Sequence, residues 1–264
     1  MSGIVWARGC SFTFGEGLQY FSNLSSVTIP KIHTFDYFEL RHSQYRFIQN
    51  NRYSKLLADK LGTIDVNSSA NGGTNNEIYN ALLKLYNTKN EPKEDRMAYL
   101  DETFVPLCDV ELIIIQFTNI FRDVIVLDGV TYPLQNMSPT WDDYVEMFIK
   151  KNMSLEEFSE KASNQVLDKF KILLQKIEIV NPNIKIRVIS WENEIDSAMR
   201  NDEYYKDKVV TFEYKDKVFK TLRDIIYSYS KLTIAEMFTR RCIDDQHMNL
   251  EGHKLIAESI YKTL

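Results

Sequence analysis

The stretch Ile4-Val5-Trp6-Ala7-Arg8-Gly9-Cys10-Ser11-Phe12-Thr13-Phe14-Gly15 decides the fold class. Its first four residues are apolar, as is typical of a short buried strand. A serine follows on the turn between Gly9 and Gly15, and glycine lets the backbone bend there. Ligands of open α/β sheets bind outside the carboxyl ends of the strands, so Ser11 lies where chemistry is expected. Taken alone, an ordinary glycine and serine turn is the better explanation, because short motifs occur by chance.

The far end of the chain carries a second polar block. Asp244-Asp245-Gln246-His247-Met248-Asn249-Leu250-Glu251-Gly252-His253 leads into a segment with apolar residues at helical spacing, which predicts the last helix. The block contains Asp-x-x-His, and a nucleophilic serine needs a histidine base and a carboxylate that orients it. His253 falls one turn into the predicted helix, where a structural role is expected.

Two more blocks lie between these ends, Asn71-Gly72-Gly73-Thr74-Asn75 and Phe117-Thr118-Asn119. Together the four blocks resemble the SGNH (GDSL-type) hydrolases, and they follow the family order over nearly the whole chain. The resemblance implies a flavodoxin-like sheet. It also implies a catalytic triad whose serine comes from one end of the chain and whose Asp-x-x-His comes from the other. The family pattern at the third block is usually Gly-x-Asn-Asp. Here Phe117 replaces the glycine and Ile120 replaces the aspartate, so Asn119 is the matching polar group.

The resemblance assigns the triad to Ser11, His247 and Asp244. Ser11 is the nucleophile, since a serine hydroxyl attacks well only when a base takes its proton. His247 is that general base and afterwards the general acid, while Asp244 fixes its tautomer and stabilises the imidazolium. Asp244 is preferred over Asp245 because the family aspartate lies three residues before the histidine.

The resemblance also implies an oxyanion hole. Its donors are the backbone N–H groups of Ser11 and Gly72 and the side-chain amide of Asn119. Gly73 is an acceptable alternative to Gly72 by register. Arg122 is close enough in sequence to reach the same cleft, although a surface position is the default for an arginine.

Two other interpretations concern acidic residues. One is a metal cluster of the last block, made of Asp244, Asp245, His247 and His253. No other histidine-rich segment supplies the second half of such a site. The other is an acid/base carboxylate pair after the strand predicted at 184–190, made of Glu192 and Glu194. Beside the triad this pair is weak evidence for a glycosidase.

Two function classes follow from these residues. The first is an esterase or carbohydrate O-deacetylase that acts on an ester of a small molecule or carbohydrate, with water as second substrate and no cofactor. The second is a catalytically silent binding or structural module of the same fold, for example a phage structural component. The altered third block favours the second class slightly. The retained Ser11, Asp244 and His247 favour the first class more strongly.

The bulk composition indicates one globular domain and excludes some partners. The chain has 264 residues, of which 44% are hydrophobic, and this is enough for a sizeable core. We predict a single domain over 1–264 with insertions at about 18–51 and 123–153. The net charge of −5 argues against a nucleic-acid partner, because phosphate binding requires a concentrated basic face.

The chain shows no sign of secretion or membrane insertion. It begins without a basic and then apolar leader, and its longest apolar runs are far too short to span a bilayer. Three scattered cysteines, Cys10, Cys108 and Cys242, fit a reducing compartment. We therefore predict a cytoplasmic protein without membrane contact, with association with a virion as the alternative.

The resemblance implies a flavodoxin-like three-layer αβα sandwich with a mostly parallel sheet of roughly five strands, and the apolar pattern of the sequence indicates where its elements lie. Further strands are expected at 64–66, 112–117 and 184–190. The segment 209–212 is either a fifth strand or part of a hairpin with 214–219. Helices are expected at 53–61 and after the capping patterns at 74–77 and 154–157.

Overall fold

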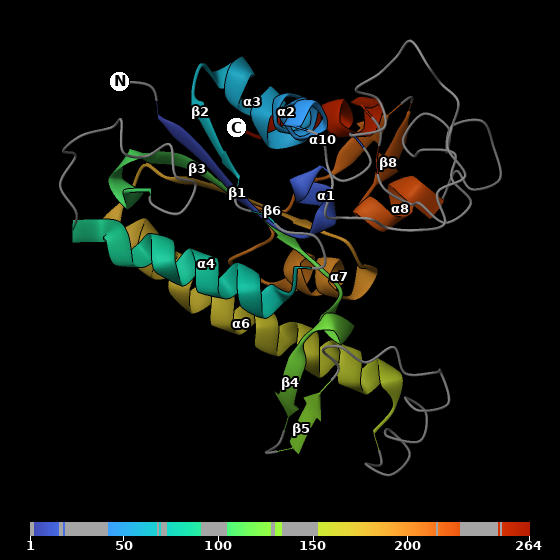
Figure 1. Cartoon of the computed structure of the whole chain (residues 1–264). Coiled ribbons are helices and arrows are strands. Elements are labelled where there is room, and N and C mark those ends of the chain that lie inside the picture. Colours follow the sequence, from blue (N-terminus) through green and yellow to red (C-terminus); the bar gives the residue numbers. More distant parts are fainter. Residues whose placement is uncertain are drawn as a thin grey trace.

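The computed structural model describes residues 3–15, 18, 42–67, 69, 73–90, 105–127, 130–133, 153–214, 216–227, 248 and 250–264. A parallel four-stranded sheet forms the centre, in the order β2-β1-β3-β6 (Figure 1). Its strands are β1 (Ile4–Arg8), β2 (Ile64–Asn67), β3 (Val110–Phe117) and β6 (Lys185–Ser190). The predicted α/β class with a parallel sheet is confirmed.

The fifth position of the sheet is taken by a short segment. Val209 makes a single parallel bridge to Val188 of β6, and the N–H of Val210 donates to the carbonyl of Val188 at 3.0 Å. Directly after it, β7 (Phe212–Tyr214) and β8 (Lys217–Phe219) form an antiparallel hairpin. Both interpretations of this region therefore hold in part. The order with Val209 outermost is the flavodoxin-like order.

The two faces of the sheet contact two separate apolar clusters. Ile4 and Trp6 of β1 belong to one cluster, and Val5 and Ala7 belong to the other. This follows from the period of two in a strand, which sends successive side chains to opposite faces. β3 is apolar on both faces, as is typical of a central strand of a parallel sheet.

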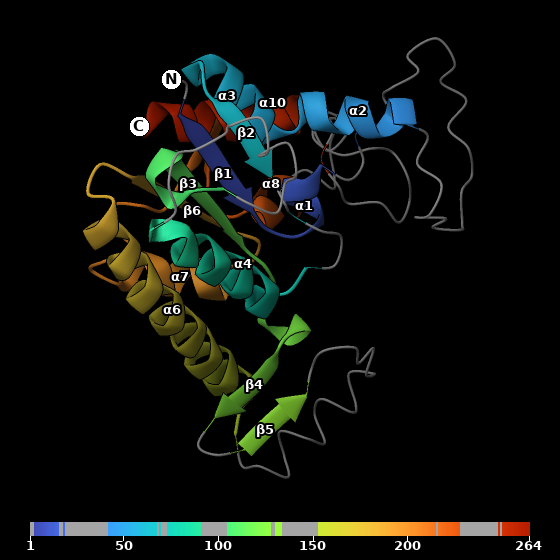
Figure 2. The same cartoon turned by 60° about the vertical axis from the view of Figure 1, so that its left-hand side comes forward.

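Helices cover both faces. α4 (Asn75–Asn87), α6 (Leu155–Val180) and α7 (Asn193–Asn201) lie on one face. The other face carries α3 (Tyr53–Leu61), α8 (Leu222–Tyr227) and α10 (Leu250–Lys262), and α2 (His42–Asn51) precedes α3 (Figure 2). The chain thus has the three layers that its sequence predicts.

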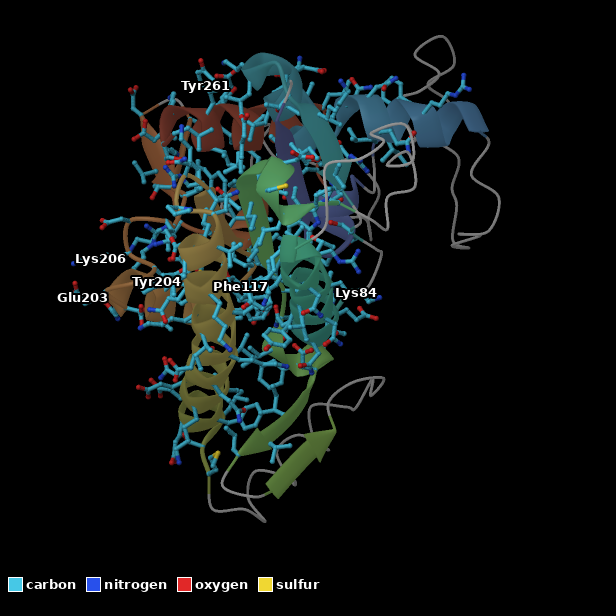
Figure 3. All side chains as sticks on the ribbon, turned by 90° about the vertical axis from the view of Figure 1, so that its left-hand side faces the viewer. Lys84, Phe117, Glu203, Tyr204, Lys206 and Tyr261 are labelled. Carbon is cyan, nitrogen blue, oxygen red and sulfur yellow. The ribbon has the colours of Figure 1, made fainter. Side chains whose placement is uncertain are left out.

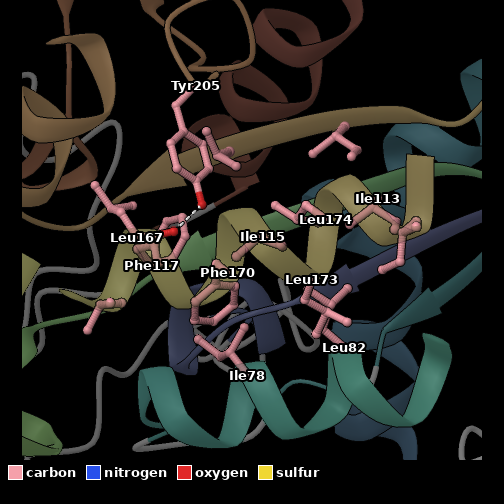
Figure 4. Packing of buried hydrophobic residues seen from close by; sticks show 14 of the residues in the cluster. Ile78, Leu82, Ile113, Ile115, Phe117, Leu167, Phe170, Leu173, Leu174 and Tyr205 are labelled. Carbon is pink, nitrogen blue, oxygen red and sulfur yellow. Dashed lines mark hydrogen bonds between the residues drawn. The ribbon is translucent and has the colours of Figure 1, made fainter. Parts of the chain in front are cut away.

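The larger cluster is centred on aromatic residues at the end of β3. Phe117 packs edge to face on Phe170 of α6 and on Tyr205, with ring centroids 4.9 and 6.5 Å apart (Figure 4). The hydroxyl of Tyr205 donates to the carbonyl of Leu167 at 2.7 Å, so this buried polar group is satisfied. Figure 3 shows Phe117 in the interior, whereas Lys84 and Glu203 are exposed.

The predicted caps set the helix starts. Thr74 accepts from the N–H of Glu77 at 3.2 Å, and the N–H of Thr74 donates to the Glu77 carboxylate at 2.9 Å. This is a complete capping box. At α6, Ser154 accepts from the N–H of Glu157 at 3.0 Å.

The segment predicted as an insertion at about 123–153 contains a β-hairpin. β4 (Val124–Leu127) pairs antiparallel with β5 (Val130–Pro133), and the hairpin projects beside α6 (Figures 1 and 2). Short 3-10 turns, η2 (Thr88–Asn90), η4 (Leu107–Asp109) and η5 (Ile120–Arg122), complete the described elements. Among these elements, none of the helices combines the length and the apolar character needed to cross a membrane.

Candidate active site

Ser11 begins a short helix directly after the central strand β1. The helix α1 (Ser11–Phe14) replaces the simple loop that the sequence suggests, with Cys10 at its N-cap. It ends at Gly15, whose φ of 96° is left-handed and whose N–H donates to the carbonyl of Ser11 at 3.0 Å. Ser11 is 4% exposed, and its hydroxyl lies 4.0 Å from the sulfur of Cys10. The serine is therefore fixed at the carboxyl edge of the sheet.

Gln116 of β3 holds this turn from the neighbouring strand. Its side-chain oxygen accepts from the backbone N–H of Cys10 at 3.2 Å, from the thiol of Cys10 at 3.2 Å and from the hydroxyl of Thr13 at 3.0 Å. Its amide nitrogen donates to the carbonyl of Phe117 at 3.1 Å. A Cβ at Gly9 would collide with Thr13 Oγ1 and would lie 2.7 Å from Gln116 Oε1. The turn therefore packs against Gln116 without room for a side chain at Gly9.

The end of β2 holds the same turn from the other side. Asn67 donates to the carbonyl of Thr13 at 2.7 Å and to the hydroxyl of Ser54 at 2.9 Å. Its side-chain oxygen accepts from the N–H of Ser69 at 3.0 Å, and Ser69 Oγ accepts from the N–H of Gly9 at 2.9 Å. All these side chains are buried, so the segment around Ser11 is fixed by neutral hydrogen bonds.

Tyr53 connects this network to the last helix. Its hydroxyl shares a 2.9 Å hydrogen bond with Thr13, and its backbone N–H donates to Nδ1 of His253 at 3.2 Å. The two rings are stacked, with centroids 6.1 Å apart. Burial raises the pKa of the Tyr53 phenol. His253 thus supports the packing of α3 on α10, in line with its expected structural role.

Asn119 follows β3, the strand next to β1. Its side-chain oxygen accepts from the N–H of Phe121 at 2.7 Å and caps η5. Its amide nitrogen donates to the carboxyl of Glu192 at 2.6 Å. Phe117 and Ile120, which stand where the SGNH pattern has glycine and aspartate, are buried in the core. The residues that differ from the SGNH pattern therefore pack in the core, while the Asn119 amide between them is oriented by its two hydrogen bonds.

The loop after β3 is joined to the start of α4. The side chain of Asn75 accepts from the N–H of Thr118 at 3.0 Å and donates to the Thr118 carbonyl at 3.1 Å. The carboxylate of Asp123 accepts from the N–H groups of Asn75 and Asn76 at 3.1 and 2.9 Å. Burial raises the pKa of Asp123, while these N–H groups lower it. The segment at Gly73, which is buried, is thus fixed relative to Asn119.

Glu192 is the most perturbed carboxyl at this edge. It follows β6, and its backbone N–H donates to Ser190 Oγ at 3.1 Å. Burial and then the charge of Glu194 raise its pKa from 4.5 to about 7, while Arg223, Arg122 and the bond from Asn119 lower it. Arg122 itself is exposed.

The structure describes part of the predicted site. Ser11 and Asn119 lie at the carboxyl ends of the neighbouring strands β1 and β3. Gly72, Asp244 and His247 lie outside the described residues, as does Cys242. Within the described ranges, no group of three or more His, Cys, Asp or Glu could hold a metal ion.

Sequence reasoning missed Gln116 and dismissed Glu192. Gln116 is the one polar residue in the apolar run 112–117, which is a usable signal for a buried hydrogen-bonding role. Glu192 lies two residues after the end of β6, at the carboxyl edge of the sheet, but its hydrogen bond with Asn119 joins residues 73 positions apart in the chain.

Comparisons with known proteins give distant likenesses only. No protein-family model matches the chain, and no curated protein matches it. One similar structure is that of a carbohydrate esterase whose active site "displays divergent catalytic and non-catalytic binding functions". It has 11% identity and a TM-score of 0.45, and the match covers 98% of this chain and 67% of that one. Another is an alpha/beta hydrolase enzyme from the metagenome of Lake Arreo, Spain, with 11% identity, a TM-score of 0.38 and coverage of 99% and 94%. Neither likeness assigns an activity.

Proposed function

We propose that the protein is a serine hydrolase of the SGNH type that cleaves a carboxylic ester, as an esterase or carbohydrate O-deacetylase. The observation that carries this proposal is the position of Ser11. It begins a helix at the carboxyl end of a central parallel strand, and Asn119 follows the adjacent strand. Ligands of such sheets bind outside this edge.

The proposed mechanism is acyl transfer through a covalent intermediate. His247 takes the proton of the Ser11 hydroxyl, and the serine oxygen attacks the ester carbonyl. His247 then gives the proton to the leaving alcohol, and Asp244 stabilises the imidazolium that forms in between. Water cleaves the acyl-serine by the same steps, so no cofactor takes part.

The negative charge on the carbonyl oxygen is stabilised by the N–H groups of Ser11 and Gly72 and by the amide of Asn119. Each such donor contributes roughly a hundredfold to a thousandfold in rate. The hydrogen bonds between Asn75 and Thr118 support this part of the proposal, because they fix the start of α4 to the loop that carries Asn119.

One observation favours the second candidate, a catalytically silent module. Ser11 is only 4% exposed, so its hydroxyl offers little surface to a substrate. In that case the four blocks are retained for the fold, and the protein binds or assembles without hydrolysis, for example in a phage particle.

Covalent labelling with a fluorophosphonate probe and hydrolysis of p-nitrophenyl acetate and acetylated sugars separate the two candidates. We expect wild-type protein to be labelled and to hydrolyse esters, and Ser11→Ala to lose both with its fold intact, because the hydroxyl carries the covalent step. Ser197→Ala is the matched control, since Ser197 is exposed on α7. Equal turnover by wild type and Ser11→Ala excludes Ser11 as nucleophile, and an inert wild type supports the silent module.

A further inference from the structure

The amide of Asn119 is held at both of its ends. Its oxygen accepts from the N–H of Phe121 at 2.7 Å, and this backbone donor fixes which end of the side chain is oxygen. One N–H of the amide nitrogen then points to Glu192 Oε1 at 2.6 Å. Within the described part of the chain, Glu192 is the acceptor for this nitrogen, so the direction of the second N–H is set as well.

Glu192 has a fixed place of its own. Its backbone is tied to Ser190, whose hydroxyl donates to the Glu192 carbonyl at 2.8 Å. The side chain is buried between the end of β6 and the loop after β3, and such a carboxyl is costly to ionise. Glu192 therefore acts on Asn119 from a rigid position.

The charge of Glu192 matters for any anion that Asn119 binds. An oxygen bound to the second N–H of Asn119 lies roughly 5 Å from the Glu192 carboxyl, at ordinary hydrogen-bond lengths. A carboxylate at that distance repels a developing oxyanion, which lowers the rate by about tenfold to a hundredfold in a partly buried site. A neutral carboxyl still accepts the hydrogen bond through its carbonyl oxygen and has no such penalty.

We propose that Glu192 is the positioning residue for the Asn119 amide, and that proton binding to its carboxyl switches this donor between an active and a weakened form. The inference rests on the proposed function, because the switch controls the oxyanion hole. Activity is high while Glu192 is neutral and falls as it ionises.

The charged groups around Glu192 set where the switch acts. Glu194 in the first turn of α7 opposes its ionisation, whereas Arg122 of η5 and Arg223 of α8 favour it. Burial dominates, and the resulting pKa of about 7 lies in the range where a histidine base also titrates. The profile of kcat against pH therefore rises with the base and then falls with Glu192.

The kinetic test compares Glu192→Gln with wild type between pH 5 and 9. Gln keeps an oxygen acceptor for Asn119 but does not titrate, so we expect its falling limb to disappear while its rising limb remains. Glu192→Ala removes both the acceptor and the charge, so its kcat should lie about tenfold below that of Glu192→Gln at every pH with KM unchanged, because the amide loses its orientation. Glu194→Gln is the control that moves the midpoint of the fall to lower pH. A falling limb that persists in Glu192→Gln overturns the switch.

A second measurement does not depend on turnover. The side-chain amide signal of Asn119 in a 15N spectrum, assigned by its loss in Asn119→Asp, should shift with pH with a midpoint near 7 in wild type. It should not shift in Glu192→Gln. An amide signal that stays constant from pH 5 to 9 in wild type refutes the inference. If the signal titrates but no ester is cleaved, the proposed function fails while the coupling of Glu192 to Asn119 stands.

Discussion

The two halves of the described active-site edge are held in different ways. The turn that carries Ser11 is fixed by neutral groups, chiefly the side chains of Gln116 and Asn67. The loop that carries Asn119 is held by the neutral side chain of Asn75 and also by two carboxyls, Glu192 at the Asn119 side chain and Asp123 at the junction with α4. Amides and hydroxyls carry no charge between pH 5 and 9, whereas a carboxyl whose pKa is raised to about 7, as at Glu192, ionises in this range.

The groups that hold the proposed nucleophile, Ser11, thus keep their charge as pH changes, whereas a carboxyl that holds the proposed anion donor, Asn119, does not. The pKa values of Glu192 and Asp123 are both raised, with burial as the largest cause. On the Ser11 side, the buried polar groups that bond to the turn are amides and hydroxyls without a charge to gain or lose. Of these two halves, the Asn119 side is therefore the one whose hydrogen bonds should respond to pH.

The largest expected effect comes from removing Gln116. Gln116→Leu keeps the size of the side chain but leaves the N–H of Cys10 without its acceptor and removes one partner of Thr13. Buried unsatisfied donors are expensive, so the free energy of unfolding should fall by about 4 kcal/mol. Urea denaturation at several pH values measures it, and the loss should be the same at each pH.

The matched control is Gln165→Leu. Gln165 also donates to a backbone carbonyl, that of Val126 at 2.8 Å, but it is exposed on α6. The expected loss is less than about 1 kcal/mol, because water replaces the bond. Similar losses for the two variants would show that the network around Ser11 is not what stabilises this edge.

Gln116 also illustrates what could not be predicted from the sequence. The apolar run predicts β3, and the capping pattern at Thr74 predicts the start of α4, because both signals are local and arise from burial and backbone hydrogen bonding. The partners of the Gln116 side-chain oxygen lie 103 to 106 residues away in the chain, and no local pattern encodes them. The fold was thus largely predictable, and the support of the site was not.

The same reason applies to the other half of the site. Asn119 could be singled out because it follows a strand, but its contact with Glu192 depends on the register between β3 and β6. That register pairs Phe117 with Ser190, which brings the residues after both strands together. The fifth strand was ambiguous for a related reason, since 209–214 contains both a parallel bridge and a hairpin arm.

The next largest effect concerns Glu192 and the stability of the fold. Its pKa is raised from 4.5 to about 7 in the folded chain, so between these values the folded chain binds more protons than the unfolded chain. The free energy of unfolding of wild type should therefore fall as pH rises through this window, by up to about 3 kcal/mol. Glu192→Gln lacks this contribution. Its free energy of unfolding should therefore increase relative to that of wild type over the same pH range.

Urea denaturation of wild type and Glu192→Gln at pH 4.5, 6, 7 and 8 measures the difference between their free energies of unfolding. Glu203→Gln serves as the control, because Glu203 is exposed and its removal should leave the difference from wild type nearly constant. If the difference in free energy of unfolding between Glu192→Gln and wild type were also independent of pH, Glu192 would ionise normally in the folded protein. The two halves of the active-site edge would then not differ in their response to pH.

The smallest expected effect comes from Gly9→Ala. This variant adds a methyl group to the tightly packed turn that carries Ser11. The new Cβ would meet Thr13 Oγ1 and would lie 2.8 Å from Gln116 Cβ, so these side chains must shift. Overpacking of this kind costs about 2 kcal/mol. Gly62→Ala is the control, since nothing lies within 4 Å of a Cβ there and only its φ of 68° opposes alanine, at about 1 kcal/mol. Urea denaturation ranks the two variants. A smaller loss at Gly9 than at Gly62 would mean that the turn yields readily and that Gln116 does not hold Ser11 rigidly.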